Sequence, residues 1–133
     1  MACGSGLDYI CYRITLRALK LIEIRWQGDS RRVAHAFPKC ARNALGKELT
    51  RIQLGLQPRD GKWLTDVGPG VQEIRITFTK EAYRVIYVVN IGECVYVLHA
   101  FHKKAKKEIA TLKGELDLAR KRYKGLVKSL RRS

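Results

Sequence analysis

Hydrophobic and polar residues alternate along several segments of the chain, and this pattern predicts strands. Residues 19–26 and 71–77 each place their apolar side chains on one side, which is typical of a half-buried strand. Residues 82–89 are apolar almost throughout, with Arg84 as the exception. Such a segment is expected in the centre of a sheet, and residues 94–101 are its predicted hairpin partner.

Apolar residues recur at helical spacing in three other segments. A short amphipathic helix is predicted around residues 33–37, and a second over residues 39–55. A last helix, capped by Thr111, is predicted to run to about Leu130 with apolar residues alternately four and three positions apart. Residues 57–70 are rich in Pro, Gly and Asp and are predicted to form a loop.

The resulting order, β-α-α-β-β-β-α, predicts an α+β fold with a helical hairpin and a C-terminal helix packed on a mostly antiparallel sheet. The helices are expected on one face of the sheet. Residues 19–133 form the single predicted domain, and residues 1–18 are an extension without an assigned role. Since Ile74 and Ile76 take the core side, Arg75 is expected to project from the opposite face.

Charge narrows the possible functions. The 133 residues include 27 Lys and Arg against 12 Asp and Glu, a formal charge of +15, and 46% of them are hydrophobic. This composition excludes a disordered chain and indicates a polyanionic partner, which could be RNA, DNA or an acidic protein. The excess is uneven: residues 102–133 carry twelve basic and three acidic side chains, while residues 69–101 are neutral.

Cysteine and histidine spacing gives no indication of a metal or a cofactor. The four cysteines, at positions 3, 11, 40 and 94, contain no C-x-x-C pair and are expected to be reduced thiols. His99 and His102 lie three apart on a predicted strand, so they should point to opposite faces and cannot share a metal. We find no signal peptide or membrane-spanning segment in the sequence, and we expect a cytoplasmic protein without a membrane partner.

Two arginines interrupt the predicted strands. Arg75 and Arg84 each need a partner or a ligand in a sheet. A salt bridge to Glu73 or Glu81 and a role in binding phosphate remain alternatives at this point, although Arg is the side chain best suited to grip phosphate.

Four lysines follow the last predicted strand between His102 and Lys107. They form either a solvated basic run or a polyanion site, and their position at the end of a strand favours the second. His99 is expected to be a hydrogen-bonded core residue, whereas His102 is the better candidate for acid–base chemistry. Three tyrosines are expected to be sheet residues, one of which could stack on a base: Tyr83, Tyr87 and Tyr96.

Three ordered blocks, Val71–Arg75, Tyr83–Tyr87 and Val95–Lys104, resemble the RelE/HigB-type toxins, specifically their phage-derived branch. The resemblance covers about residues 20–125. It implies a RelE-like fold and the toxin of a bacterial type II toxin–antitoxin system. Such toxins cleave mRNA in the ribosomal A site, without a metal, by attack of the ribose 2′-OH on the adjacent phosphate. The implied antitoxin is a helix-turn-helix DNA-binding protein.

Site residues follow from the resemblance by position. Arg75 and Arg84 would neutralise the scissile phosphate, and Lys103 would be the catalytic basic residue after the last core strand. The tyrosine that better-known members use a few residues later is absent, and His102 replaces a more usual glutamine; we therefore expect His102 to move the proton. The expected catalytic residues are Arg75, Arg84, His102 and Lys103, and the expected RNA-binding residues are Lys62, Lys104, Lys106 and Lys107.

Two alternatives use the same scaffold. One is a toxin like the related ParE proteins, which poison DNA gyrase and lack the RNA-cutting basic set. The other is a non-catalytic basic module that binds RNA or the ribosome with a steep salt dependence.

Overall fold

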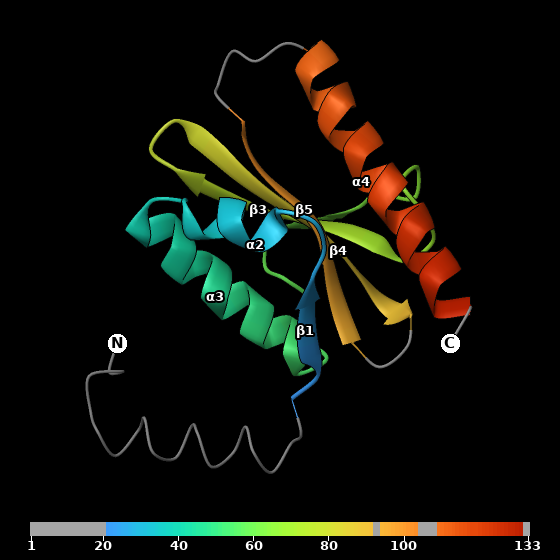
Figure 1. Ribbon diagram of the computed structural model, residues 1–133. Coiled ribbons are helices and arrows are strands. Elements are labelled where there is room, and N and C mark those ends of the chain that lie inside the picture. The colour runs from blue at the N-terminus through green and yellow to red at the C-terminus, as the bar shows by residue number, and fades with distance from the viewer. Residues whose placement is uncertain (1–20, 92–93, 104–108, 132–133) are drawn as a thin grey trace.

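A computed structural model describes residues 21–91, 94–103 and 109–131. A five-stranded sheet lies between a helical hairpin and a long C-terminal helix (Figure 1). The elements, in chain order, are β1 (Glu23–Trp26), α2 (Ser30–His35), α3 (Lys39–Gln53), β2 (Gly61–Trp63), β3 (Val71–Phe78), β4 (Glu81–Ile91), β5 (Cys94–Lys103) and α4 (Ile109–Arg131).

The sheet has the strand order β1-β5-β4-β3-β2, and only β1 pairs in parallel, with β5. The prediction that the apolar segment 82–89 is the central strand is confirmed, since β4 is the middle strand and four of its residues are at most 1% exposed. Strand β2 was not predicted. It lies inside the segment expected to be a loop, and its three exposed residues are too few to show an alternating pattern.

Helices cover both faces of the sheet, not one. α2 and α3 pack on the face that carries Ile74 and Val85, whereas α4 packs on the face that carries Ile86 and Phe101. The prediction of a single covered face is wrong because β4 is apolar on both sides, and each side needs a covering element. We call these the hairpin face and the α4 face.

A β-bulge in β5 changes which side chains reach α4. Ile86 pairs with His99 and the next residue, Tyr87, pairs with Val97, so Leu98 is an extra residue in the ladder. Leu98 packs in the core beneath α4, and the adjacent His99 also contacts α4 through Glu115. The bulge therefore turns two consecutive side chains toward the same helix.

The helix boundaries agree with their local sequence except at the start of α4. Helix α3 ends two residues earlier than predicted, and Gly55 follows with a φ of +84°, the left-handed conformation that glycine favours after a helix. Helix α4 has already begun at Ile109, so Thr111 lies within its first turn and is not the cap. Among the described residues, no helix is long and apolar enough to cross a membrane.

Candidate phosphate-binding site

Arg75 and Arg84 lie directly opposite each other on β3 and β4. Cross-strand partners share a face, with Cβ atoms about 5 Å apart. Two like charges in this position destabilise the sheet unless a negative group compensates them. Because Ile74 and Ile76 pack under the helical hairpin, both arginines belong to the α4 face, as predicted for Arg75.

One carboxylate compensates Arg84. The Glu73 side chain is 1% exposed, and both of its oxygens accept hydrogen bonds from Nη1 of Arg84, at 3.2 and 3.3 Å. Of the two salt bridges considered from the sequence, the one between Arg84 and Glu73 is therefore present. The other candidate, Glu81, instead contacts the His102 ring.

Arg75 has no such partner within the described part of the chain. Its Nε is buried and makes no hydrogen bond, and no described carboxylate forms an ion pair with it. The Nε of Arg84 is also buried and unpaired. An unmade hydrogen bond on a buried donor costs about 1–3 kcal/mol. Two guanidinium groups with one carboxylate thus leave uncompensated charge and unused donors, which suit a phosphate.

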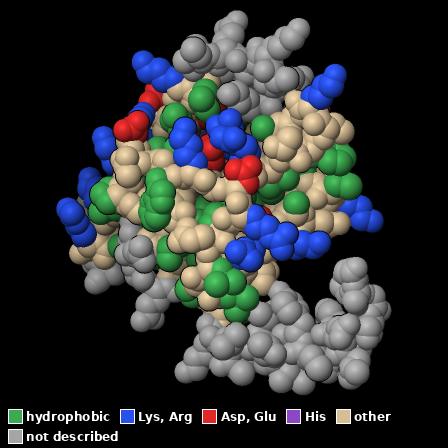
Figure 2. Space-filling view, turned by 180° about the vertical axis from the view of Figure 1, so that it is seen from behind, with side chains coloured by type: hydrophobic (Ala, Val, Ile, Leu, Met, Phe, Trp, Pro, Cys, Tyr) green, Lys and Arg blue, Asp and Glu red, His purple; other side chains and the backbone are tan. Residues whose placement is uncertain are grey.

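A lysine of the neighbouring strand extends this basic surface. Lys62 on β2 pairs with Glu73 and is exposed, so it lies on the same face as the arginines. The backbone of Lys103 pairs with Ala82, two residues beyond the pair that Phe101 forms with Arg84. Figure 2 shows Lys and Arg side chains gathered around acidic ones on the side of the molecule turned away in Figure 1. Three other predicted RNA-binding residues, Lys104, Lys106 and Lys107, lie outside the described residues.

His102 lies on the hairpin face, away from the arginines. It pairs with Tyr83, and the two rings stack with centroids 4.4 Å apart. Tyr83 is buried under the helical hairpin, and burial raises the pKa of its hydroxyl. The structure therefore does not bring His102 together with Arg75 and Arg84, because neighbouring residues on a strand point to opposite faces.

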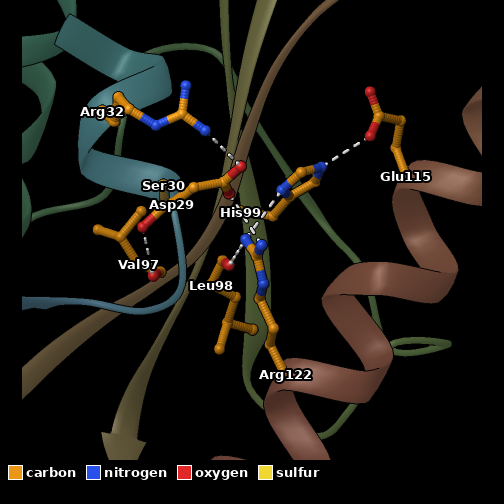
Figure 3. A network of polar contacts seen from close by, with 8 residues as sticks. All are labelled: Asp29, Ser30, Arg32, Val97, Leu98, His99, Glu115 and Arg122. Atoms are coloured by element: carbon orange, nitrogen blue, oxygen red, sulfur yellow. Dashed lines mark hydrogen bonds and ion pairs between the residues drawn. The ribbon is translucent and has the colours of Figure 1, made fainter.

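A partly buried polar network joins three segments of the chain on the other side of β5 (Figure 3). His99 Nε2 lies 2.8 Å from Glu115 Oε1, and its Nδ1 lies 3.2 Å from Nη1 of Arg122. Arg122 also donates to the Leu98 carbonyl oxygen at 3.0 Å and to Asp29 Oδ1 at 2.8 Å. The prediction that His99 is a hydrogen-bonded core residue is confirmed.

The network fixes the tautomer of His99. A guanidinium can only donate, so Nδ1 must accept and Nε2–H must donate to Glu115. The same guanidinium, by its hydrogen bond, lowers the pKa of Asp29. No local sequence pattern indicates this network, since Asp29 and Arg122 are 93 positions apart. It fastens α4 to the strand that leads toward Lys103.

These features define the class of the protein. A helical hairpin and a C-terminal helix on opposite faces of a mostly antiparallel sheet form the RelE-like fold, here with two paired arginines on the α4 face. A structure of an E. coli toxin RelE mutant in the free state aligns with a TM-score of 0.52 and 15% identity, covering 73% of this chain and 95% of that chain.

A profile of the family described as "Phage derived protein Gp49-like (DUF891)" matches residues 33–124. The chain therefore belongs to this phage-derived family, and the predicted family and fold are both confirmed. No curated protein matches the sequence.

Proposed function

We propose that this protein is the toxin of a type II toxin–antitoxin system and acts as a ribosome-dependent mRNA endoribonuclease. Membership of the Gp49-like family and the likeness to toxin RelE support the first part. The observation that carries the second is the pair Arg75 and Arg84, which has one carboxylate for two guanidinium groups and buried donors without partners.

The proposed reaction needs no metal, because RNA supplies its own nucleophile. The ribose 2′ oxygen forms a bond to the adjacent phosphorus while the bond to the 5′ oxygen of the next nucleotide breaks. The products are a 2′,3′-cyclic phosphate and a free 5′-hydroxyl. Arg75 and Arg84 would bind the non-bridging oxygens and stabilise the negative charge that develops on them.

The lysines have two proposed roles. Lys103 is the last residue of β5, the strand that pairs with Arg84, and we assign it the proton transfer that the 2′-OH and the leaving oxygen require. Lys62 is exposed next to Glu73 and would hold the RNA backbone, together with Lys104, Lys106 and Lys107. His102, on the other face, takes no part in this mechanism.

The proposed partners follow from this activity. The substrate is mRNA in the ribosomal A site, and a cognate antitoxin, of the helix-turn-helix DNA-binding kind, neutralises the toxin. Both encounters take place in the cytoplasm. The charge of +15 favours binding to RNA and to an acidic partner.

Expression in a bacterium, followed by mapping of mRNA 5′ ends, tests the proposal. We expect growth arrest and new 5′ ends within translated codons. Arg75→Gln should abolish both, while Arg31→Gln, an exposed arginine of α2, should abolish neither. Arrest with intact mRNA and inhibited gyrase would support the ParE-like alternative instead, and ribosome binding without new ends would support a non-catalytic module.

A further inference from the structure

A groove runs along the C-terminal half of α4, apart from the paired arginines. It has a volume of about 760 Å³, within the range of ligand-binding clefts. Its floor is apolar and its rim is basic. The groove is lined by Pro69, Tyr123, Lys124, Val127, Lys128 and Arg131. We call it the α4 groove.

The floor of the α4 groove is held in place by the loop before β3. The Tyr123 ring packs against Gly68, where an added Cβ would collide with the ring carbons. The Tyr123 hydroxyl donates to the Pro69 carbonyl oxygen at 3.4 Å, and Arg120 Nε donates to the Asp66 carbonyl oxygen at 3.0 Å. A preformed floor lowers the entropy lost on binding.

The rim carries one sign of charge. Lys124, Lys128 and Arg131 are exposed, and none of the described residues that line the groove is acidic. Within the described part of the chain, none of the three forms an ion pair. The first two are one helical turn apart, so their charges lie on one side of α4.

We propose that the α4 groove binds an acidic peptide segment of another protein, with an apolar side chain on the floor and carboxylates on the three cations. The chain's own residues 1–20 fit poorly, since they carry three basic residues and one acidic. A second copy brings a charge of +15. An RNA would satisfy the cations and offer a base to Tyr123, but it has no aliphatic group to cover Val127.

Fluorescence anisotropy on the full chain tests this inference without any nuclease assay, so it stands or falls separately from the proposed function. The probe is a short fluorescein-labelled peptide of glutamates with leucines at helical spacing. A second probe has serines in place of the leucines, and a third is a short single-stranded RNA. Circular dichroism confirms that each variant is folded.

We expect the leucine peptide to bind more tightly than the serine peptide. The double variant Lys124→Glu/Lys128→Glu should weaken its binding at least about tenfold, because like charges would then oppose each other. The matched control Lys39→Glu/Lys47→Glu makes the same change of net charge on α3 and should weaken it less than about twofold, since distant exposed charges are screened. Val127→Ser should weaken the leucine peptide and leave the serine peptide unchanged.

Three results would overturn the inference. The two double variants could weaken the leucine peptide equally, which would mean that only net charge matters. The two peptides could bind equally, which would remove the role of the floor. The reversal at Lys124 and Lys128 could weaken the RNA alone, which would make the groove a nucleic-acid site.

Discussion

Replacing Glu73 by leucine should destabilise the protein strongly. Glu73 is 1% exposed, and the Arg84 side chain that it neutralises is 13% exposed. Removing the carboxylate leaves two arginines facing each other across β3 and β4 without a described acidic partner. The loss in free energy of unfolding should therefore be that of leaving a buried charge unpaired.

The magnitude follows from the burial of both groups. Breaking a buried ion pair from one side costs about 3–5 kcal/mol. Small domains have a free energy of unfolding of about 5–15 kcal/mol, so this is a large share of it. At about 4 °C per kcal/mol for a chain of this size, the melting temperature should fall by roughly 12–20 °C.

Thermal unfolding followed by circular dichroism measures this effect. The double variant Glu73→Leu/Arg84→Met removes both charges and should regain most of the lost stability, since a buried pair can be replaced by apolar residues at little cost. Glu23→Leu is the matched control, because its ion pair with Arg25 is solvent-exposed and should contribute far less. A Glu73→Leu variant that melts like this control would show that the buried pair contributes little, and so would a double variant no more stable than Glu73→Leu alone.

Three further predictions concern other parts of the fold. His102→Gln should change the rate of mRNA cleavage by less than about threefold, because the ring lies on the hairpin face. Loss of a group that stabilises the transition state would instead lower the rate about 10²–10³-fold. A loss of that size in a single-turnover assay would show that His102 belongs to the site. Gly68→Ala should lower the free energy of unfolding in urea by about 1–3 kcal/mol, because the new Cβ would collide with the Tyr123 ring. Gly46→Ala lies in α3 with open space around its Cβ and should raise the free energy of unfolding by about 0.5–1 kcal/mol. Equal effects of the two variants would contradict the packing of Tyr123 on Gly68. Because Arg122 lowers the pKa of Asp29 in the folded state, their contact stabilises above the unfolded pKa near 3.8 and is lost as the pH falls through the folded value. The stability gap between wild type and Arg122→Met should accordingly narrow below about pH 4, and a gap independent of pH would contradict the pairing.

Local periodicity was sufficient to predict most of the elements. The continuous apolar stretch in β4 marks the sheet centre, and helical spacing locates α3 and α4, because burial imposes these patterns on the residues themselves. Strand β2 could not be predicted in this way. Its three residues are exposed and owe their conformation to pairing with β3.

The candidate site depends on the register in which the strands pair, and the hydrophobic periodicity of each strand does not determine that register. Opposite positions on β3 and β4 bring Arg75 and Arg84 together, and the same ladder sends His102 to the other face. The bulge at Leu98 determines that His99 reaches α4. The contact between Asp29 and Arg122 depends on how α4 packs, which no local pattern records.

Single-turnover cleavage of an mRNA placed in the A site of purified ribosomes tests the central proposal most directly. We expect wild type to cleave the mRNA to a 2′,3′-cyclic phosphate. The folded Arg75→Gln variant should lose about 10²–10³-fold in rate, and Arg31→Gln should cleave at a near-normal rate. An intact mRNA with wild-type protein, or an Arg75→Gln variant that cleaves as fast as wild type, would contradict the proposal.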